Sequence, residues 1–201
     1  MKEYFFLIIL ASCLFVEEKS STSIPVDAGS HKKCVLCCDS LNVYWNRCIS
    51  GEGFEGIIIT GNKQMENNIS LLQIKDLQTK RFWNPSDSSI ILFERKFQTE
   101  YPKIFAKISH DNSQKQIFDL NNYSRQYLGF VDVDGNKSLL VGFTRFDSPE
   151  LNNHFNDIKE YYSKYFNFPK DYGSNFFLAK YSEYHGKIMS VEYDAVEYKE
   201  W

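Results

Sequence analysis

The turn at Asp134-Gly135-Asn136 is the feature that most constrains what this chain can fold into. It lies between two runs of β-prone residues, Tyr123–Val133 and Lys137–Phe146. Asp-Gly between two such runs favours a β-hairpin, because both residues tolerate the positive φ that a tight turn requires. We therefore predict that the two runs are antiparallel neighbours in a sheet.

One long helix is predicted upstream of this hairpin. Ser86 or Asp87, in the segment Asn84-Pro85-Ser86-Asp87, can cap the free amides of a first helical turn. Apolar residues then recur at roughly the helical period of 3.6 residues, and Pro102 is expected to kink or end the helix. The apolar positions are Ile90, Phe93, Phe97, Ile104 and Phe105.

Other runs predict further strands. Ile57–Thr60 is β-branched, and Leu71–Phe82 shows partial alternation of apolar and polar residues. Asn175–Tyr181 and Ile188–Tyr193 are predicted to close the sheet through a turn at His185-Gly186. A helix beside several strands of this kind indicates the α+β class.

Several short motifs follow one another along the chain: Trp83-Asn84-Pro85-Ser86, Phe93-Glu94, the run Tyr123–Phe130, and Asp171-x-Gly173-Ser-x-Phe176-Phe177. Their order resembles a group of uncharacterised bacterial exported lipoproteins with a cystatin-like α+β domain. The resemblance spans roughly Leu71–Tyr193, and it implies a domain over residues 61–201 but no activity. The fold that it implies is one main helix packed on a curved antiparallel sheet of about four to five strands.

The N-terminus has the features of an export signal. Lys2 precedes a short apolar block, Tyr4–Ala11, that ends in small residues. Leu10-Ala11-Ser12-Cys13 resembles the bacterial lipobox, in which the cysteine is lipidated and becomes the new N-terminus. We therefore expect a signal peptide at residues 1–12 and a lipid on Cys13. The alternative is an ordinary cleaved signal peptide with an incidental cysteine.

Residues 13–33 are predicted to be a flexible tether. They are mostly polar, contain Pro25 and Gly29, and show no apolar periodicity. An acylated Cys13 would attach this tether to a membrane outside the cytoplasm. The expected location is the cell envelope, with secretion as the alternative, and the expected partners are that membrane and another envelope or extracellular protein.

A cysteine-rich segment, residues 34–60, is predicted between the tether and the domain. Export favours disulfides among its four cysteines, with the pairing left open. A zinc site and a redox dithiol are alternatives, but two adjacent cysteines are poorly spaced as zinc ligands. A redox dithiol commonly lies at a strand–helix junction in a βαβ unit, which the sequence does not reveal. The four residues are Cys34, Cys37, Cys38 and Cys48.

No motif in the chain predicts a catalytic residue, a metal ligand or a cofactor. The charged helix residues Glu94, Arg95, Lys96 and Glu100 are interpreted as a solvated face with local ion pairs. A net charge of −3 and a pI of about 5.8 argue against nucleic-acid binding. The histidines have mostly polar neighbours and are expected at the surface: His31, His110, His154 and His185.

The expected function is therefore a non-enzymatic binding module. Tyr123, Arg125 and Tyr127 alternate along one face of a predicted strand and form the candidate binding surface. The alternative is that this face simply carries cross-strand aromatic pairs.

Two other functions remain open. One is a small hydrolase or ligand-binding enzyme on a related cone-shaped α+β fold, which would have a deep apolar pocket between helix and sheet. The other is a protease inhibitor, because cystatins use a Gln-x-Val-x-Gly hairpin. Here Gln126-Tyr127-Leu128-Gly129 is one residue shorter than that motif and lacks its valine.

Overall fold

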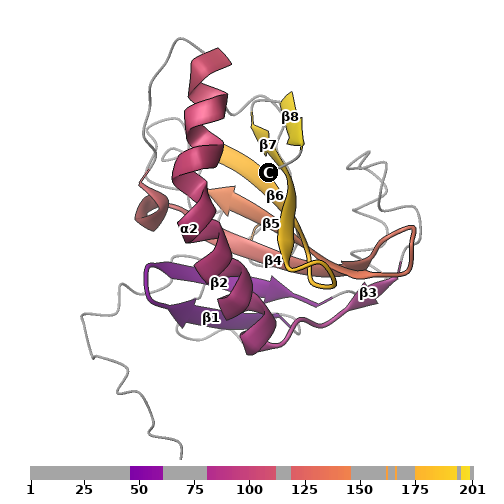
Figure 1. Cartoon of the computed structure of the whole chain (residues 1–201). Coiled ribbons are helices and arrows are strands. Elements are labelled where there is room, and N and C mark those ends of the chain that lie inside the picture. Colours follow the sequence, from indigo (N-terminus) through magenta and orange to yellow (C-terminus); the bar gives the residue numbers. More distant parts are fainter. Residues whose placement is uncertain are drawn as a thin grey trace, which may run out of the picture. The chain divides into compact units, whose positions relative to one another are not determined.

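The computed structural model describes residues 46–60, 81–111, 119–145, 162, 166, 175–193 and 196–199. In these residues one long helix, α2 (Asp87–Asp111), packs against a sheet of eight strands (Figure 1), which confirms the predicted α+β class. A short 3-10 helix, η2 (Leu120–Asn122), precedes the central hairpin. The strands are β1 (Arg47–Gly51), β2 (Phe54–Ile59), β3 (Phe82–Trp83), β4 (Ser124–Val131), β5 (Lys137–Thr144), β6 (Phe176–Ser182), β7 (Lys187–Tyr193) and β8 (Val196–Lys199).

The sheet is larger than predicted and not purely antiparallel. Its strand order is β1-β2-β4-β5-β6-β7-β8, and β3 pairs with β4 outside this order. All neighbouring strands are antiparallel except β2 and β4, which are parallel. The prediction of about four to five antiparallel strands is thus wrong in number and in this one pairing. Parallel neighbours need a long crossover, here the segment containing α2, and such a crossover leaves no turn signal in the sequence.

The central hairpin, β4 and β5, is confirmed, although its turn is longer than a two-residue loop. The Gly135 N–H donates to the Asp132 carbonyl over 3.1 Å, and the Asp132 N–H donates to the Asn136 carbonyl over 2.9 Å. Gly135 has a φ of 84°. This is the three-residue hairpin loop in which a turn is followed by a left-handed glycine. The predicted closing pair, β6 and β7, is also confirmed, with Gly186 of its turn at a φ of 61°.

The hairpin of β1 and β2 lies inside the segment 34–60 that the sequence suggested as separate from the domain. Its strand β2 confirms the predicted strand near Ile57–Thr60 and pairs with β4 at the centre of the sheet. The sheet therefore extends upstream of residue 61, within the compact unit Lys33–Trp201. Gly53, with a φ of 72°, lies in the tight turn that joins β1 to β2. Of the predicted strand Leu71–Phe82, all but the last two residues lie outside the described residues.

The start of α2 is as predicted, and the helix continues past Pro102. Ser86 is the N-cap, because its hydroxyl accepts the Ser89 N–H over 3.2 Å. Pro102 lies inside the helix rather than at its end. A proline in a helix interior removes one backbone hydrogen bond at a cost of about 3 kcal/mol. The helix continues because Ile104 and Phe105, beyond the proline, are buried in the core.

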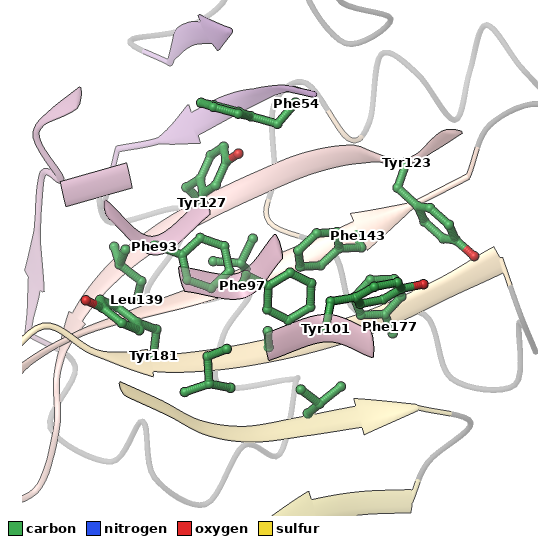
Figure 2. Packing of buried hydrophobic residues seen from close by; sticks show 14 of the residues in the cluster. Phe54, Phe93, Phe97, Tyr101, Tyr123, Tyr127, Leu139, Phe143, Phe177 and Tyr181 are labelled. Atoms are coloured by element: carbon green, nitrogen blue, oxygen red, sulfur yellow. The ribbon is translucent and has the colours of Figure 1, made fainter. Parts of the chain in front are cut away.

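Aromatic rings fill the space between α2 and the sheet (Figure 2). Phe97 of α2 stacks on Phe143 of β5 with ring centroids 4.9 Å apart, and Phe143 stacks on Phe177 of β6 at 4.2 Å. The opposite face of the central strands is buried as well, since Leu128, Leu140 and Leu178 point there and are inaccessible. The middle of the sheet is thus covered on both faces, which explains why β4 and β5 lack a polar, solvated side.

A close backbone approach at Gly129 gives a test of this packing. A Cβ atom on Gly129 would lie 2.3 Å from the Trp83 carbonyl oxygen of β3, whereas a Cβ on Gly142 would meet only ordinary contacts at 3.5–3.6 Å. Gly129→Ala should lower the free energy of unfolding by about 1–3 kcal/mol. Gly142→Ala should change it little, or raise it by up to about 1 kcal/mol. Urea unfolding followed by circular dichroism measures both, and equal losses would contradict the described pairing of β3 with β4.

Candidate functional site

The three residues predicted as a binding surface are buried. Tyr123, Arg125 and Tyr127 share one face of the chain around β4, as expected, but that face lies under α2. The prediction that they form an exposed surface is therefore wrong. The alternation of the strand shows which residues share a face, but the sequence does not show which face the helix covers.

These residues instead form a buried polar cluster with Glu94 of α2, which we call the Glu94 cluster (Glu94, Arg125 and Tyr127). Glu94 is only 1% exposed and Arg125 is 0% exposed. The Tyr127 hydroxyl donates to Glu94 Oε1 over 2.8 Å, and Arg125 Nε lies 3.5 Å from the same oxygen. Glu94 faces inward because it is adjacent to Phe93 and three residues before Phe97, on the helix face that packs on the sheet. The interpretation of Glu94 as a solvated residue is wrong.

The solvated interpretation holds for two other residues of the helix. Lys96 and Glu100 form an ion pair of 2.8 Å with i,i+4 spacing. Pairs of this kind on a helix surface contribute about 0.3–0.5 kcal/mol. Glu94 and Glu100 are therefore chemically alike but differ in environment, which makes Glu100 a matched control for Glu94.

The guanidinium group of Arg125 connects three parts of the fold. Its Nη1 donates to the Tyr123 carbonyl beside β4, and its Nη2 donates to the Gly53 carbonyl in the β1–β2 turn over 3.2 Å. It also lies over the Phe143 ring at 5.3 Å from the centroid. The same β1–β2 turn is bound to α2 directly, since Gln98 Nε2 donates to the Glu52 carbonyl over 3.2 Å. Arg125 thus joins the helix, the central strand and the N-terminal hairpin.

The electrostatics of the cluster favour a protonated carboxyl. Burial raises the pKa of Glu94 above its usual value, while the charge of Arg125 and the hydrogen bond from Tyr127 act in the opposite direction. Among the described residues, Glu94 Oε2 and Arg125 Nε have no hydrogen-bond partner. A buried carboxyl with a raised pKa keeps its proton to a higher pH than an exposed carboxyl does.

The two most exposed large apolar side chains of the described residues lie in the turns at the hairpin end of the sheet. Tyr184 is 75% exposed in the β6–β7 turn, and Val133 is 61% exposed in the β4–β5 turn. Figure 1 shows both turns at the same end of the sheet, where the Glu183 N–H donates to the Lys137 carbonyl over 3.0 Å. We call Ile91, Leu92, Val133 and Tyr184 the hairpin-end residues.

The start of α2 belongs to this end too, because the Ser89 hydroxyl donates to Glu183 Oε1. Leu92 and Ile91 follow Ser89 in the first turns of the helix and are exposed. Sequence reasoning missed the hairpin-end residues. The available signal was an apolar side chain in each polar turn, Val133 between two aspartates and Tyr184 between Glu183 and His185.

The remaining predicted site residues fall largely outside the described part of the chain. The signal peptide, Cys13, the tether, Cys34, Cys37 and Cys38 all lie outside it. Cys48 has an exposed side chain on β1, and the disulfide pairing stays a prediction.

His185 is exposed in the β6–β7 turn, as expected, with its ring 4.9 Å from that of Tyr184. Within residues 46–60, 81–111 and the later described ranges, no three His, Cys, Asp or Glu side chains come together as a metal site. No helix in those ranges is long and apolar enough to cross a membrane.

Comparison of the chain with protein-family models, curated proteins and solved structures gives no match. The fold, the Glu94 cluster and the hairpin-end residues are therefore the basis for assigning a function.

A double-mutant cycle tests whether the cluster couples helix and sheet. Arg125→Met should lower the free energy of unfolding at neutral pH by about 3–5 kcal/mol, because it leaves Glu94 buried beside no cation. Adding Glu94→Met should recover part of this loss, since an apolar pair replaces a buried ion pair at little cost. Lys96→Met, which breaks the exposed Lys96–Glu100 pair, should cost no more than about 0.5 kcal/mol. Additive losses from the two cluster substitutions would show that Glu94 and Arg125 are not coupled.

Proposed function

We propose that this protein is an exported, lipid-anchored binding module without catalytic activity, and that its hairpin-end residues contact a partner protein. The observation that carries the proposal is the exposure of Tyr184 and Val133 on two adjacent turns. Tyrosine is enriched among residues that dominate binding energy at protein interfaces. Tyr184 and Val133, both exposed at the same end of the sheet, are the candidates for such a contact. The partner is an envelope or extracellular protein.

The interior between α2 and the sheet supports a binding role over the enzyme alternative. A hydrolase or ligand-binding enzyme of a cone-shaped fold would hold its substrate there. In the described residues this space is occupied by the rings of Phe93, Phe97, Phe143 and Phe177. The enzyme alternative still has one observation in its favour, the raised pKa of Glu94. Catalysis by Glu94 would require α2 to move, because the carboxyl is buried.

The protease-inhibitor alternative has less support. The segment that resembles the cystatin motif, Gln126–Gly129, lies inside β4, and the side chains of Gln126, Tyr127 and Leu128 are buried. A cystatin-like relation of the fold is supported by α2 followed by the antiparallel order β4 to β8. The parallel pairing of β2 with β4 departs from a purely antiparallel cystatin-like sheet.

Export and the lipid anchor rest on the sequence around Leu10-Ala11-Ser12-Cys13. The intact mass of the protein extracted from membranes tests this part of the proposal. We expect a chain that starts at Cys13 and carries added acyl mass, with the cysteines oxidised before reduction and alkylation. A chain cleaved elsewhere without added mass would remove the anchor, and free thiols would reopen the zinc and redox alternatives.

Photo-crosslinking in the producing cells tests the binding surface. A photoreactive phenylalanine analogue at position 184 should give discrete protein adducts, because Tyr184 is exposed at the hairpin end. The same group at Thr99, exposed on α2, is the matched control and should give none. Val133→Asp should weaken the adducts formed from position 184 several-fold, because it places a charge in an apolar contact. Equal crosslinking from positions 99 and 184, or adducts unaffected by Val133→Asp, would contradict the proposal.

A further inference from the structure

The face of α2 that packs on the sheet carries one carboxyl group, that of Glu94, among aromatic rings. Glu94 lies between Phe93 and Phe97 along the chain, and both rings are completely buried. Its Oε1 accepts the Tyr127 hydroxyl, while its Oε2 has no hydrogen-bond partner among the described residues. A buried polar oxygen of this kind is costly to leave unsatisfied, and more so when it is charged.

Few charged or titratable groups face Glu94 from the elements that pack against it. From β4 they are Arg125 and Tyr127, and from β6 the helix-facing residues include Tyr181, whose ring lies 5.6 Å from that of Phe93. Burial raises the pKa of Tyr181, so this phenol stays neutral where Glu94 titrates. The helix-facing side chains of β2, β5 and β7 near the centre of the sheet are apolar: Phe54, Ile58, Leu139, Val141, Phe143, Ile188 and Val191.

Arg125 compensates only part of the charge on Glu94. The 3.5 Å between Arg125 Nε and Glu94 Oε1 is an ion-pair distance without a hydrogen bond at Nε. The guanidinium instead donates from Nη1 and Nη2 to the carbonyls of Tyr123 and Gly53. Those carbonyls keep Arg125 bound whether or not Glu94 is ionised. Ionisation of Glu94 therefore adds a desolvated charge that its neighbours satisfy incompletely.

We propose that Glu94 makes the packing of α2 on the sheet depend on pH. The protonated carboxyl keeps the helix packed, and loss of that proton to solvent weakens the packing. The geometry that carries this inference is the buried carboxyl with one unpartnered oxygen at the centre of the helix–sheet contact. The inference does not depend on the proposed binding function. It would let an exported domain respond to the pH of its surroundings.

The direction of the effect follows from linkage. Burial holds the pKa of Glu94 in the folded protein above its value of 4.5 in an unfolded chain. The stabilisation by the neutral form is then complete below pH 4.5 and is lost as pH rises through the folded-state pKa. Stability that depends on Glu94 should thus fall, not rise, as the pH increases above 4.5 toward the folded-state pKa.

Carbon-13 NMR of the full chain tests this pH dependence directly. The Glu94 carboxyl carbon, assigned through bonds to its own amide, should titrate with a midpoint above 4.5. Across the same pH range, hydrogen-exchange protection of the α2 amides, corrected for intrinsic exchange rates, should fall. The expected loss is about tenfold for each pH unit between the unfolded and folded midpoints.

Two variants separate Glu94 from the other carboxylates. Glu94→Gln should remove this loss of protection, whereas Glu100→Gln, at a partly exposed position on the same helix, should retain it. A Glu94 midpoint at or below 4.5, or the same pH dependence in Glu94→Gln and the unmodified protein, would overturn the proposal. The carboxyl titration needs no variant, so the proposal remains testable if Glu94→Gln does not fold.

Discussion

The fold depends on how a fully buried arginine is accommodated. Arg125 sits on the central strand under the helix, and the donors of a buried guanidinium require oxygen partners. Glu94 Oε1, from α2, lies 3.5 Å from Arg125 Nε, and the carbonyls of Tyr123 and Gly53 accept hydrogen bonds from Nη1 and Nη2. Three segments that are far apart in the sequence must therefore be in place together: the β1–β2 turn, the helix and β4.

This requirement gives the helix a unique position on the sheet. Aromatic packing alone would allow α2 to shift along the sheet, because neighbouring rings can exchange partners at similar distances and still exclude water. The Glu94 cluster allows only one position, since a shift of α2 by one residue would replace Glu94 with Phe93 or Arg95 and remove the carboxyl that contacts Arg125 and Tyr127. A polar cluster of this kind can specify one arrangement even where its net contribution to stability is small.

The accessible apolar groups lie at the surface of the described sheet rather than in its interior. With α2 on one face, and with the opposite face of the central strands buried, the middle of the described sheet offers little access to a ligand. The accessible apolar groups are displaced to the turns and to the start of the helix. The same elements that bury Arg125 therefore present Tyr184 and Val133, because β4 and β6 both lead directly into those turns.

The local parts of this fold were predictable from the sequence, and the long-range parts were not. Asp134-Gly135 predicted the central hairpin, and Ser86 predicted the start of α2, because turns and caps are short-range signals. The parallel pairing of β2 with β4 was missed, and the sequence left open whether Pro102 kinks or ends the helix, since tertiary packing decides both. Glu94 and Arg125 were each read as solvent-facing because ionic groups are usually exposed, and only their contact across the helix–sheet interface reverses that expectation.

The most direct measurement is the solvent exchange of the Arg125 side chain, observed through its Nε–H signal in nitrogen-15 NMR spectra. Burial under α2 predicts a sharp Nε–H resonance that exchanges slowly with water, is absent in Arg125→Lys, and moves in Glu94→Gln. The exposed Arg95 of the same helix serves as the internal reference and should exchange rapidly. An Arg125 signal that exchanges as fast as that of Arg95, and that is insensitive to Glu94→Gln, would contradict the buried cluster on which this account rests.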